Sequence, residues 1–367
     1  PRVGALADAR VEAARGLDAL VVAESLHARA WLDAVLARDR DPREAAAQSL
    51  LDARVRQRDD AWPALDRAAL LARLDGREAL VLLSVDGAAW RVHVRDGAAT
   101  IATLTPAQLA TVERWRHAAG DPALATAAAA ALVPADIAAR PGALYIVAND
   151  ALADLPFAAL RVDGRFVIEA RPIVRLPGLA ALGCRDGAWT DARVFVGDAR
   201  GDLPHAAAEV RRLAGAAARV GPAADLAAVR AAAGATLLHA AVHGRVNGRA
   251  GALELADGAL TPAAVLDQRL APRTVVLTGC NTATGGDAEA WGSFPSAFLA
   301  AGSRHVVATL RSVPDAAAAE VVRAYYAQPE DLGPAVRLAA AQRQVAATVP
   351  VDDWAAFTVW GDAACGP

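Results

Sequence analysis

The spacing of apolar residues divides the chain into a helical segment and a longer region of alternating strands and helices. Across residues 1–75, apolar side chains such as Leu17 and Leu20 recur every three or four positions, as on one face of an α-helix. Asp75-Gly76 ends this segment, because Asp-Gly is a turn sequence. Helical hairpins of this length cannot bury their apolar faces alone, so we expect residues 1–75 to pack on the rest of the chain or to dock a partner.

From residue 76 the chain consists of short apolar runs separated by helical stretches. The runs 79–85 and 90–94 flank Asp86-Gly87, which is a hairpin signal. Further strands are predicted at 143–148, 192–197, 235–243, 252–255, 274–279 and 305–310, and helices at 106–118, 122–138, 205–218, 223–233, 261–267, 291–301, 315–327 and 333–347. Apolar strands that alternate with helices predict an α/β fold with a mostly parallel sheet covered by helices on both faces.

Two of the predicted strands end in side chains that carry chemistry. His243-Gly244 follows the apolar run LLHAAV, and Cys280 follows the run TVVLTG. Neighbouring parallel strands lie about 4.8 Å apart, and their carboxyl ends form the ligand-binding edge of an open α/β sheet. We therefore expect the two side chains to meet over one substrate carbonyl.

A thiol beside an imidazole indicates nucleophilic catalysis. The imidazole of His243 takes the proton of Cys280 and later returns it to the leaving amine. Gly244 lets the backbone approach the substrate, and the amides of Gly244 and Cys280 are the candidate oxyanion hole. Taken singly, a Cys or a His after an apolar strand also fits a structural role, so the residues alone leave both interpretations open.

Charge and composition argue against several other functions. The net charge is −3 and 55% of the residues are apolar, which fits a folded domain and not a nucleic-acid binder. No apolar run reaches the roughly 18 residues of a membrane span, and no signal peptide is recognised. Cys184, Cys280 and Cys365 form no C-x-x-C pair and fit free thiols in a reducing compartment. The sequence thus predicts a soluble, cytoplasmic protein without contact to membranes.

Metal and cofactor sites are also not indicated. His239 and His243 are four residues apart on a strand, which is not the helical spacing of a metal pair, and no convincing third ligand follows. The Gly285-Gly286 pair lacks a Walker-type lysine, and the chain contains no lysine at all, so nucleotide binding is a minor alternative. The chemistry of a Cys–His pair needs no cofactor.

Several stretches of the sequence together resemble the CHAT domain, a bacterial relative of caspases and separases that often follows tetratricopeptide repeats. They occur in the order expected for that family, over roughly residues 77–365. They are LYIVANDALADLPFAALRVDGRFVIEARPI (144–173), VFVGDARGDLPHAAAEV (194–210), LLHAAVHG (237–244), LELADGALTPAAVL (253–266), VVLTGCNTATGG (275–286), FPSAFLAAGSRHVVATLRSVPD (294–315) and DDWAAFTVWGD (352–362). The helical stretch LVVAESLHARAWLDAVL is similar to the last repeat helices before such domains.

The resemblance implies a caspase-like domain at 76–367, with an inactive first half at 76–190 and a catalytic half at 191–367. The catalytic His-Gly and Cys of the family fall on His243-Gly244 and Cys280. Two positions depart from the family pattern. Arg311 stands where a Trp is usual, and Gly279 stands where Ser or Ala is usual. A glycine at the latter position is also found in separases.

The substrate preference is suggested by one acidic side chain. In separases, an acidic residue in the loop after the following strand binds arginine at P1, and Asp315 stands at a comparable place. Asp315 also suits the N-terminus of helix 315–327. Asp150 and Asp154 are weaker candidates for the same role. Binding of an acidic P1 residue would instead require the positive charges of Arg245 and Arg311. A preference for a hydrophobic P1 residue also stays open.

The resemblance suggests a regulated bacterial cysteine endopeptidase in antiviral defence or cell death. Its substrate would be one or a few proteins, such as a gasdermin-like pore-forming protein, and residues 1–75 would bind an activating partner. The alternative is a catalytically silent, caspase-like scaffold that binds partners through this helical arm.

Overall fold

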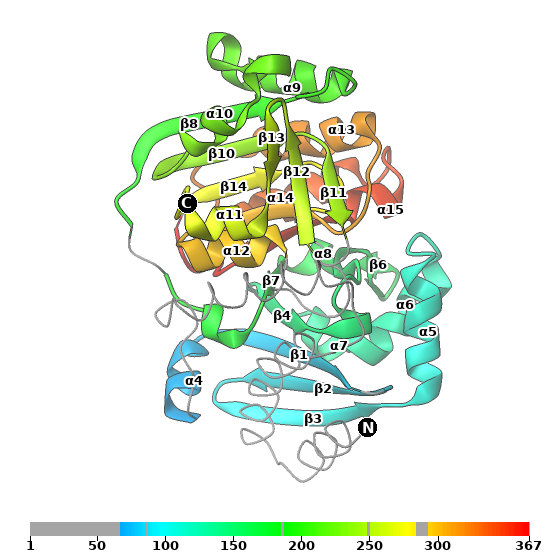
Figure 1. The fold of residues 1–367 in the computed structure, drawn as a ribbon. Coiled ribbons are helices and arrows are strands. Elements are labelled where there is room, and N and C mark those ends of the chain that lie inside the picture. Colours follow the sequence, from blue (N-terminus) through cyan, green and yellow to red (C-terminus); the bar gives the residue numbers. More distant parts are fainter. Residues whose placement is uncertain (1–66, 86, 185–186, 248–249, 284–292, 367) are drawn as a thin grey trace, which may run out of the picture.

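The computed structural model describes residues 67–85, 87–184, 187–247, 250–283 and 293–366 (Figure 1). Most of the expected helical segment 1–75 lies outside the described residues, and its end is α4 (Arg67–Arg73). Arg73 Nη1 at the end of α4 donates a 2.9 Å hydrogen bond to the carbonyl of Ala180 in the 3-10 helix η3 (Leu179–Ala181). This contact anchors α4 on η3.

An 11-stranded sheet forms the centre of the described chain. Its spatial order is β3-β2-β1-β4-β7-β16-β15-β14-β10-β8-β9, and among these described strands only the pairs β1–β2, β2–β3 and β15–β16 are antiparallel. The strands are β1 (Glu78–Val85), β2 (Ala88–Arg95), β3 (Ala98–Leu104), β4 (Leu144–Ala148), β7 (Ile173–Leu176), β8 (Thr190–Gly197), β9 (Arg219–Val220), β10 (Ala235–Ala241), β14 (Thr274–Leu277), β15 (His305–Thr309) and β16 (Phe357–Gly361). This topology confirms the predicted mostly parallel sheet.

Helices cover both faces of the second-half strands. Along each strand, alternate side chains point to opposite faces, so Leu237 and Val276 join one buried cluster while Leu238 and Val275 join the other. The first cluster includes α9 (Pro204–Ala214), α13 (Asp315–Tyr326) and α14 (Pro334–Val345), and the second includes α10 (Leu226–Arg230), α11 (Pro262–Asp267) and α12 (Phe294–Ala301). Because both faces are covered, these strands read as nearly continuous apolar runs.

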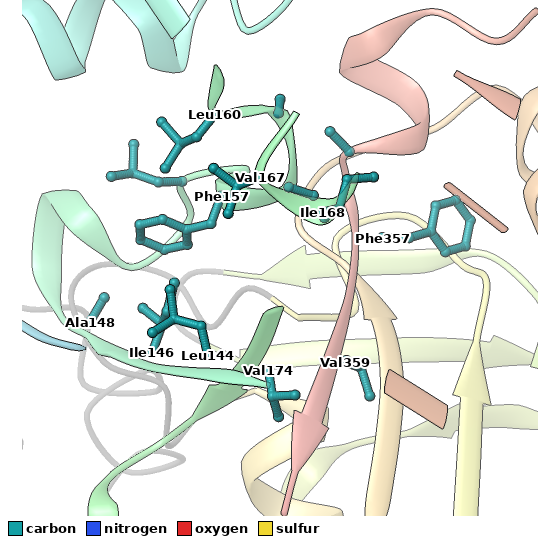
Figure 2. Packing of buried hydrophobic residues seen from close by; sticks show 14 of the residues in the cluster. Leu144, Ile146, Ala148, Phe157, Leu160, Val167, Ile168, Val174, Phe357 and Val359 are labelled. Carbon is teal, nitrogen blue, oxygen red and sulfur yellow. The ribbon is translucent and has the colours of Figure 1, made fainter. Parts of the chain in front are cut away.

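The core of the first half is built around β4 and the segment after it. Figure 2 shows Leu144 and Ile146 of β4 beside Phe157 and Val167, and Phe157 is 2% exposed. The Leu-Pro-Phe motif is thus a core element. The elements here are α5 (Pro106–Arg116), α6 (Pro122–Leu132), α7 (Ala135–Ala138), α8 (Val167–Ala170), β5 (Arg161–Val162), β6 (Arg165–Phe166), η1 (Asp150–Leu152) and η2 (Phe157–Ala159). The single helix predicted at 122–138 was wrong, because Pro134 separates α6 from α7.

A small antiparallel sheet follows β10 immediately. It consists of β11 (Gly244–Asn247), β12 (Ala250–Leu255) and β13 (Gly258–Leu260), and Figure 1 shows it in front of the central sheet. The short 3-10 helices η4 (Gly215–Ala217) and η5 (Gly221–Ala223) lie on either side of β9 in the chain. Val242 and His243 are therefore the two residues that link the central sheet to the small one.

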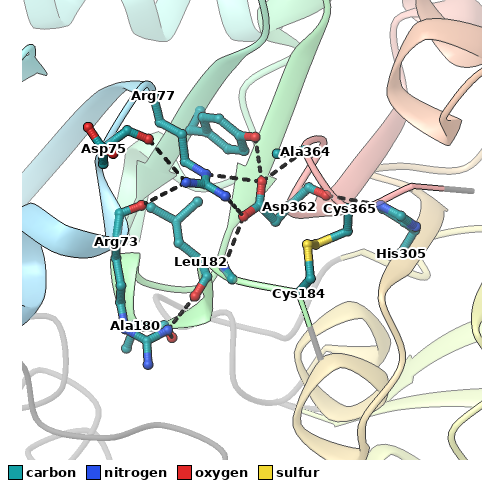
Figure 3. Close-up of polar contacts among 12 residues, drawn as sticks. Arg73, Asp75, Arg77, Ala180, Leu182, Cys184, His305, Asp362, Ala364 and Cys365 are labelled. Carbon is teal, nitrogen blue, oxygen red and sulfur yellow. Dashed lines mark hydrogen bonds and ion pairs between the residues drawn. A yellow bond between two sulfur atoms is a disulfide. The ribbon is translucent and has the colours of Figure 1, made fainter. Parts of the chain in front are cut away.

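The two halves are joined at β16, which lies between β7 and β15 and is preceded by α15 (Val351–Trp354). Asp362, directly after β16, accepts hydrogen bonds from Arg77 Nη2 at 2.6 Å and from the Tyr145 hydroxyl at 2.6 Å (Figure 3). Beside it, Cys184 and Cys365 form a disulfide across 181 positions of sequence. The expectation of three free thiols was wrong, because the fold brings these two distant cysteines to a Cα–Cα distance of 5.2 Å. Cys280 is free.

No helix in the described part of the chain is both long and apolar enough to cross a bilayer.

Candidate active site

Three neighbouring parallel strands end at the same edge of the sheet. β10 lies between β8 and β14, with Ala240 opposite Val196 on one side and opposite Leu277 on the other. The loops that leave these strands carry Asp202, His243 and Cys280. The strands before His243 and Cys280 are therefore direct neighbours, as the sequence predicted.

Two glycines bring the loops of His243 and Cys280 into direct backbone contact. A Cβ atom on Gly244 would lie 2.0 Å from the carbonyl oxygen of Cys280, and one on Gly279 would lie 2.2 Å from the carbonyl oxygen of Val242. Neither distance is possible for real atoms, so both positions require glycine. Gly244 was expected to leave room for the substrate, and the structure gives it a second role in the approach of the two loops.

The loop of Cys280 is held by the strand next to it. Thr309 in β15 donates its backbone N–H to the Thr282 hydroxyl at 2.9 Å, and its own hydroxyl donates to the carbonyl of Gly279. The thiol is partly exposed, and its sulfur lies 3.9 Å from the carbonyl oxygen of Val313. These contacts hold the partly exposed Cys280 beside the loop of His243.

His243 is oriented by a carboxylate that the sequence analysis did not single out. Its Nε2 lies 2.8 Å from Asp202 Oδ1, and this hydrogen bond lowers the pKa of Asp202 below its usual range. An ionised carboxylate only accepts hydrogen bonds, so Nε2 is the donor of this bond and Nδ1 is left for other partners. The signal was present in the sequence: Asp202 follows the predicted strand 192–197, which ends at the same sheet edge.

The amides proposed for the oxyanion hole are not used elsewhere in the described fold. Gly244 stands opposite Leu253, while the next pair is hydrogen bonded through Glu254 N–H and the His243 carbonyl at 2.9 Å. Hydrogen-bonded and non-hydrogen-bonded pairs alternate in antiparallel ladders, so the N–H of Gly244 points away from β12. Among the described residues, the Cys280 N–H has no acceptor either.

Asp315 is the first residue of α13, as expected, but its carboxylate caps a different helix. Its two carboxylate oxygens accept hydrogen bonds from the N–H groups of His205 at 2.8 Å and Ala206 at 3.0 Å. These are the first free amides of α9, whose own N-cap residue, Leu203, has no side-chain acceptor. Asp315 thus satisfies the N-terminus of α9 and makes no side-chain cap on α13, where the N-cap is Pro314.

The other charged candidates for the substrate pocket are paired. Arg245 Nε lies 3.2 Å from Glu254, and Arg311 Nη1 lies 3.0 Å from Asp352. Asp154 accepts from Arg116 Nη2 at 2.6 Å. The side chain of Asp150 lies outside the described residues.

The remaining histidine and metal-ligand side chains near the strands have other partners. His239 is fully buried and hydrogen bonded to Glu209 at 2.7 Å. Among the described residues, Cys184, Asp362 and Cys365 are grouped like metal ligands, but the disulfide occupies both sulfurs.

Comparison with known proteins identifies a family and similar solved structures. The family model of the CHAT domain matches residues 120–362. Two crystal structures of the Saccharomyces cerevisiae separase–securin complex are 12% identical over 60% of this chain, with TM-scores of 0.45 and 0.44. The match covers 16% and 15% of the chains in those structures, so this protein spans a small part of their length. No curated protein matches the sequence.

Proposed function

Because the chain belongs to the CHAT domain family, we propose that it is a cysteine endopeptidase in which Cys280 is the nucleophile and His243 the general base. The observation that carries the proposal is the set of three neighbouring parallel strands whose loops bear Asp202, His243 and Cys280, with the loops of His243 and Cys280 in backbone contact. A base, a group that orients the base, and a thiol are the parts that thiol catalysis needs.

The proposed reaction begins with proton transfer from the Cys280 thiol to Nδ1 of His243. The thiolate attacks the carbonyl carbon of the substrate peptide bond, and the amides of Gly244 and Cys280 stabilise the oxyanion. When the C–N bond breaks, the imidazolium donates its proton to the leaving amine. Water, deprotonated by His243, then hydrolyses the thioester and releases the carboxylic acid and the free thiol.

Asp202 is proposed as the positioning residue of this site. Its hydrogen bond to Nε2 fixes the tautomer and ring orientation of His243, and its negative charge stabilises the imidazolium formed during the reaction. Asp202→Asn should therefore lower kcat by a larger factor than it changes KM.

A cleavage assay with a peptide library diversified at P1 tests the proposed function. We expect Cys280→Ala and His243→Ala to lower cleavage about 1,000-fold or more, while the exposed control His117→Ala keeps the wild-type rate. Cleavage that survives in Cys280→Ala would contradict the proposal. A wild type that cuts nothing and binds a partner equally well as Cys280→Ala would favour the non-catalytic scaffold.

The preference for a basic P1 residue stays a proposal. Both carboxylate oxygens of Asp315 accept hydrogen bonds from backbone amides, which supports a structural role for this residue. These contacts therefore give the proposed arginine pocket no added support. The same library decides the point, because cleavage restricted to Arg or Lys would require an acidic pocket.

The biological role proposed from the family resemblance is regulated cleavage of one or a few proteins in bacterial defence or cell death. A pore-forming substrate and an activating partner that binds residues 1–75 would suit that role. Co-expression with the products of neighbouring genes tests it, and the absence of any cleaved product would count against it.

A cytoplasmic location is likewise proposed. The Cys184–Cys365 disulfide is uncommon in that compartment, so cell fractionation is the direct test. Recovery of the protein outside the cytoplasmic fraction would contradict this part of the proposal.

A further inference from the structure

A cavity of about 80 Å³ lies at the opposite end of the strands from His243 and Cys280. Thr236 and Leu237 line it near the start of β10, and Thr274 lines it at the start of β14. Helices α13 and α14 close its side. The charged and phenolic side chains that line it are Arg193, Arg273, Tyr325, Tyr326, Glu330 and Arg337.

Within the part of the chain that the structure describes, three polar atoms of the residues that line this cavity have no hydrogen-bond partner. They are Arg273 Nε, Arg337 Nε and the hydroxyl of Tyr325, and all three atoms are buried. Buried polar atoms in folded proteins are nearly always paired, because an unpaired one loses its hydrogen bonds to water without replacement. Each of these atoms carries a hydrogen that it can donate, so the missing partner is an acceptor.

The charges around the cavity do not balance. Glu330 is held by Arg193 through two hydrogen bonds of 2.8 and 2.7 Å, and this exposed pair is neutral as a unit. Among the described residues, no carboxylate lies within 4 Å of the guanidinium nitrogens of Arg273 or Arg337. Two partly buried positive charges therefore remain without an ion-pair partner.

The charged form of Arg273 is destabilised by its surroundings. Burial lowers the pKa of Arg273, and the positive charges of Arg304 and Arg193 lower it further, while the carboxylate of Asp191 raises it. Arg337 stacks over the ring of Tyr325 at 4.4 Å, which fixes its guanidinium at the wall of the cavity. An anion bound beside Arg273 would offset this repulsion, and its oxygens would supply acceptors for the unpaired donors.

We propose that this cavity binds the phosphate group of a small phosphomonoester through Arg273, Arg337 and Tyr325. A tetrahedral oxyanion offers acceptors to several donors at once, and guanidinium groups match phosphate oxygens with paired hydrogen bonds. The Arg193–Glu330 pair at the cavity is largely exposed, so the organic part of the ligand can extend into solvent there. This proposal does not rest on the proposed peptidase activity.

Calorimetry and thermal unfolding with sodium phosphate test the site, with sodium chloride at equal ionic strength as the reference. We expect phosphate to bind and to raise the Tm of the wild type, and phenyl phosphate to bind at least as well. Arg273→Gln and Arg337→Gln should each weaken binding about tenfold or more, because each removes charged hydrogen bonds to the ligand. Arg212→Gln, which changes an exposed arginine of α9, should bind as the wild type does.

Unfolding without phosphate separates binding from a structural role. Arg273→Gln should be at least as stable as the wild type in chloride, because it removes a partly buried charge that has no ion-pair partner. If Arg273→Gln does not fold, Arg337→Gln decides the question. Phosphate that acts no better than chloride, or that shifts the Tm of Arg337→Gln as much as that of the wild type, would overturn the proposal.

Discussion

Gly244 and Gly279 set the separation between the candidate base and the candidate nucleophile. Each would place a Cβ atom within 2.2 Å of a backbone oxygen in the other loop, so a substitution forces these loops apart. We expect Gly279→Ala to abolish cleavage and to lower the free energy of unfolding by about 1–3 kcal/mol.

Gly333→Ala is the matched control, because nothing lies within 4 Å of the Cβ it would add and its φ of −62° suits any residue. It should keep full activity and change the free energy of unfolding by less than about 0.5 kcal/mol. Equal effects of the two substitutions in urea denaturation and peptide cleavage would contradict the role given to the glycine pair.

A second prediction at this scale concerns His305, whose pKa burial lowers to about 4 from the ordinary 6.5. Between these two values the unfolded chain binds a proton that the folded protein does not. The free energy of unfolding should therefore fall by roughly 2–3 kcal/mol as the pH decreases from 6.5 to 4, and His305 should contribute no pH dependence above that range.

Denaturation curves at several pH values test this. His305→Gln should lack most of the decrease, whereas His117→Gln, which changes an exposed ring, should retain it. An unchanged slope in His305→Gln would show that another group binds the proton.

At the scale of elements, the contact of Asp315 links the N-termini of α9 and α13. The carboxylate accepts two N–H groups of α9 that Leu203 cannot satisfy. Asp315→Ala should lower the free energy of unfolding by about 0.5–2 kcal/mol and leave the P1 preference unchanged. The exposed Asp331→Ala is the control for both measurements. Loss of cleavage after arginine at unchanged stability would instead favour the pocket role.

The long elements of the second half were predicted from the sequence, whereas several short ones were not. The strand and helix order of the second half was predicted from its long apolar runs, and β10, β14, β15, α13 and α14 begin within one residue of the expected positions. Short elements at the junction, such as β7 and β16, were not predicted, because four or five residues carry too little periodicity to identify a strand.

At the scale of the whole molecule, the Cys184–Cys365 disulfide closes most of the described chain into one loop. A cross-link over so long a loop restricts the unfolded chain strongly, so reduction should lower the free energy of unfolding by roughly 2–5 kcal/mol. Cys365→Ser should show the same loss without reductant, and Cys280→Ser should not. If alkylation and mass spectrometry find three reactive thiols in the native protein, the disulfide is absent.

The sequence by itself determined the local features of this protein and the identity of its reactive side chains. Apolar runs that alternate with helices specify an α/β sheet, and strand ends that carry His243 and Cys280 specify which groups reach its edge, because both depend on residues close together in the chain. Only the tertiary structure decided which distant residues meet. Asp202 beside His243, Asp315 on α9, Cys184 against Cys365 and the arginines around the cavity all join segments that no local pattern connects. Such contacts depend on the order and register of the strands, and these are fixed by packing of the entire sheet.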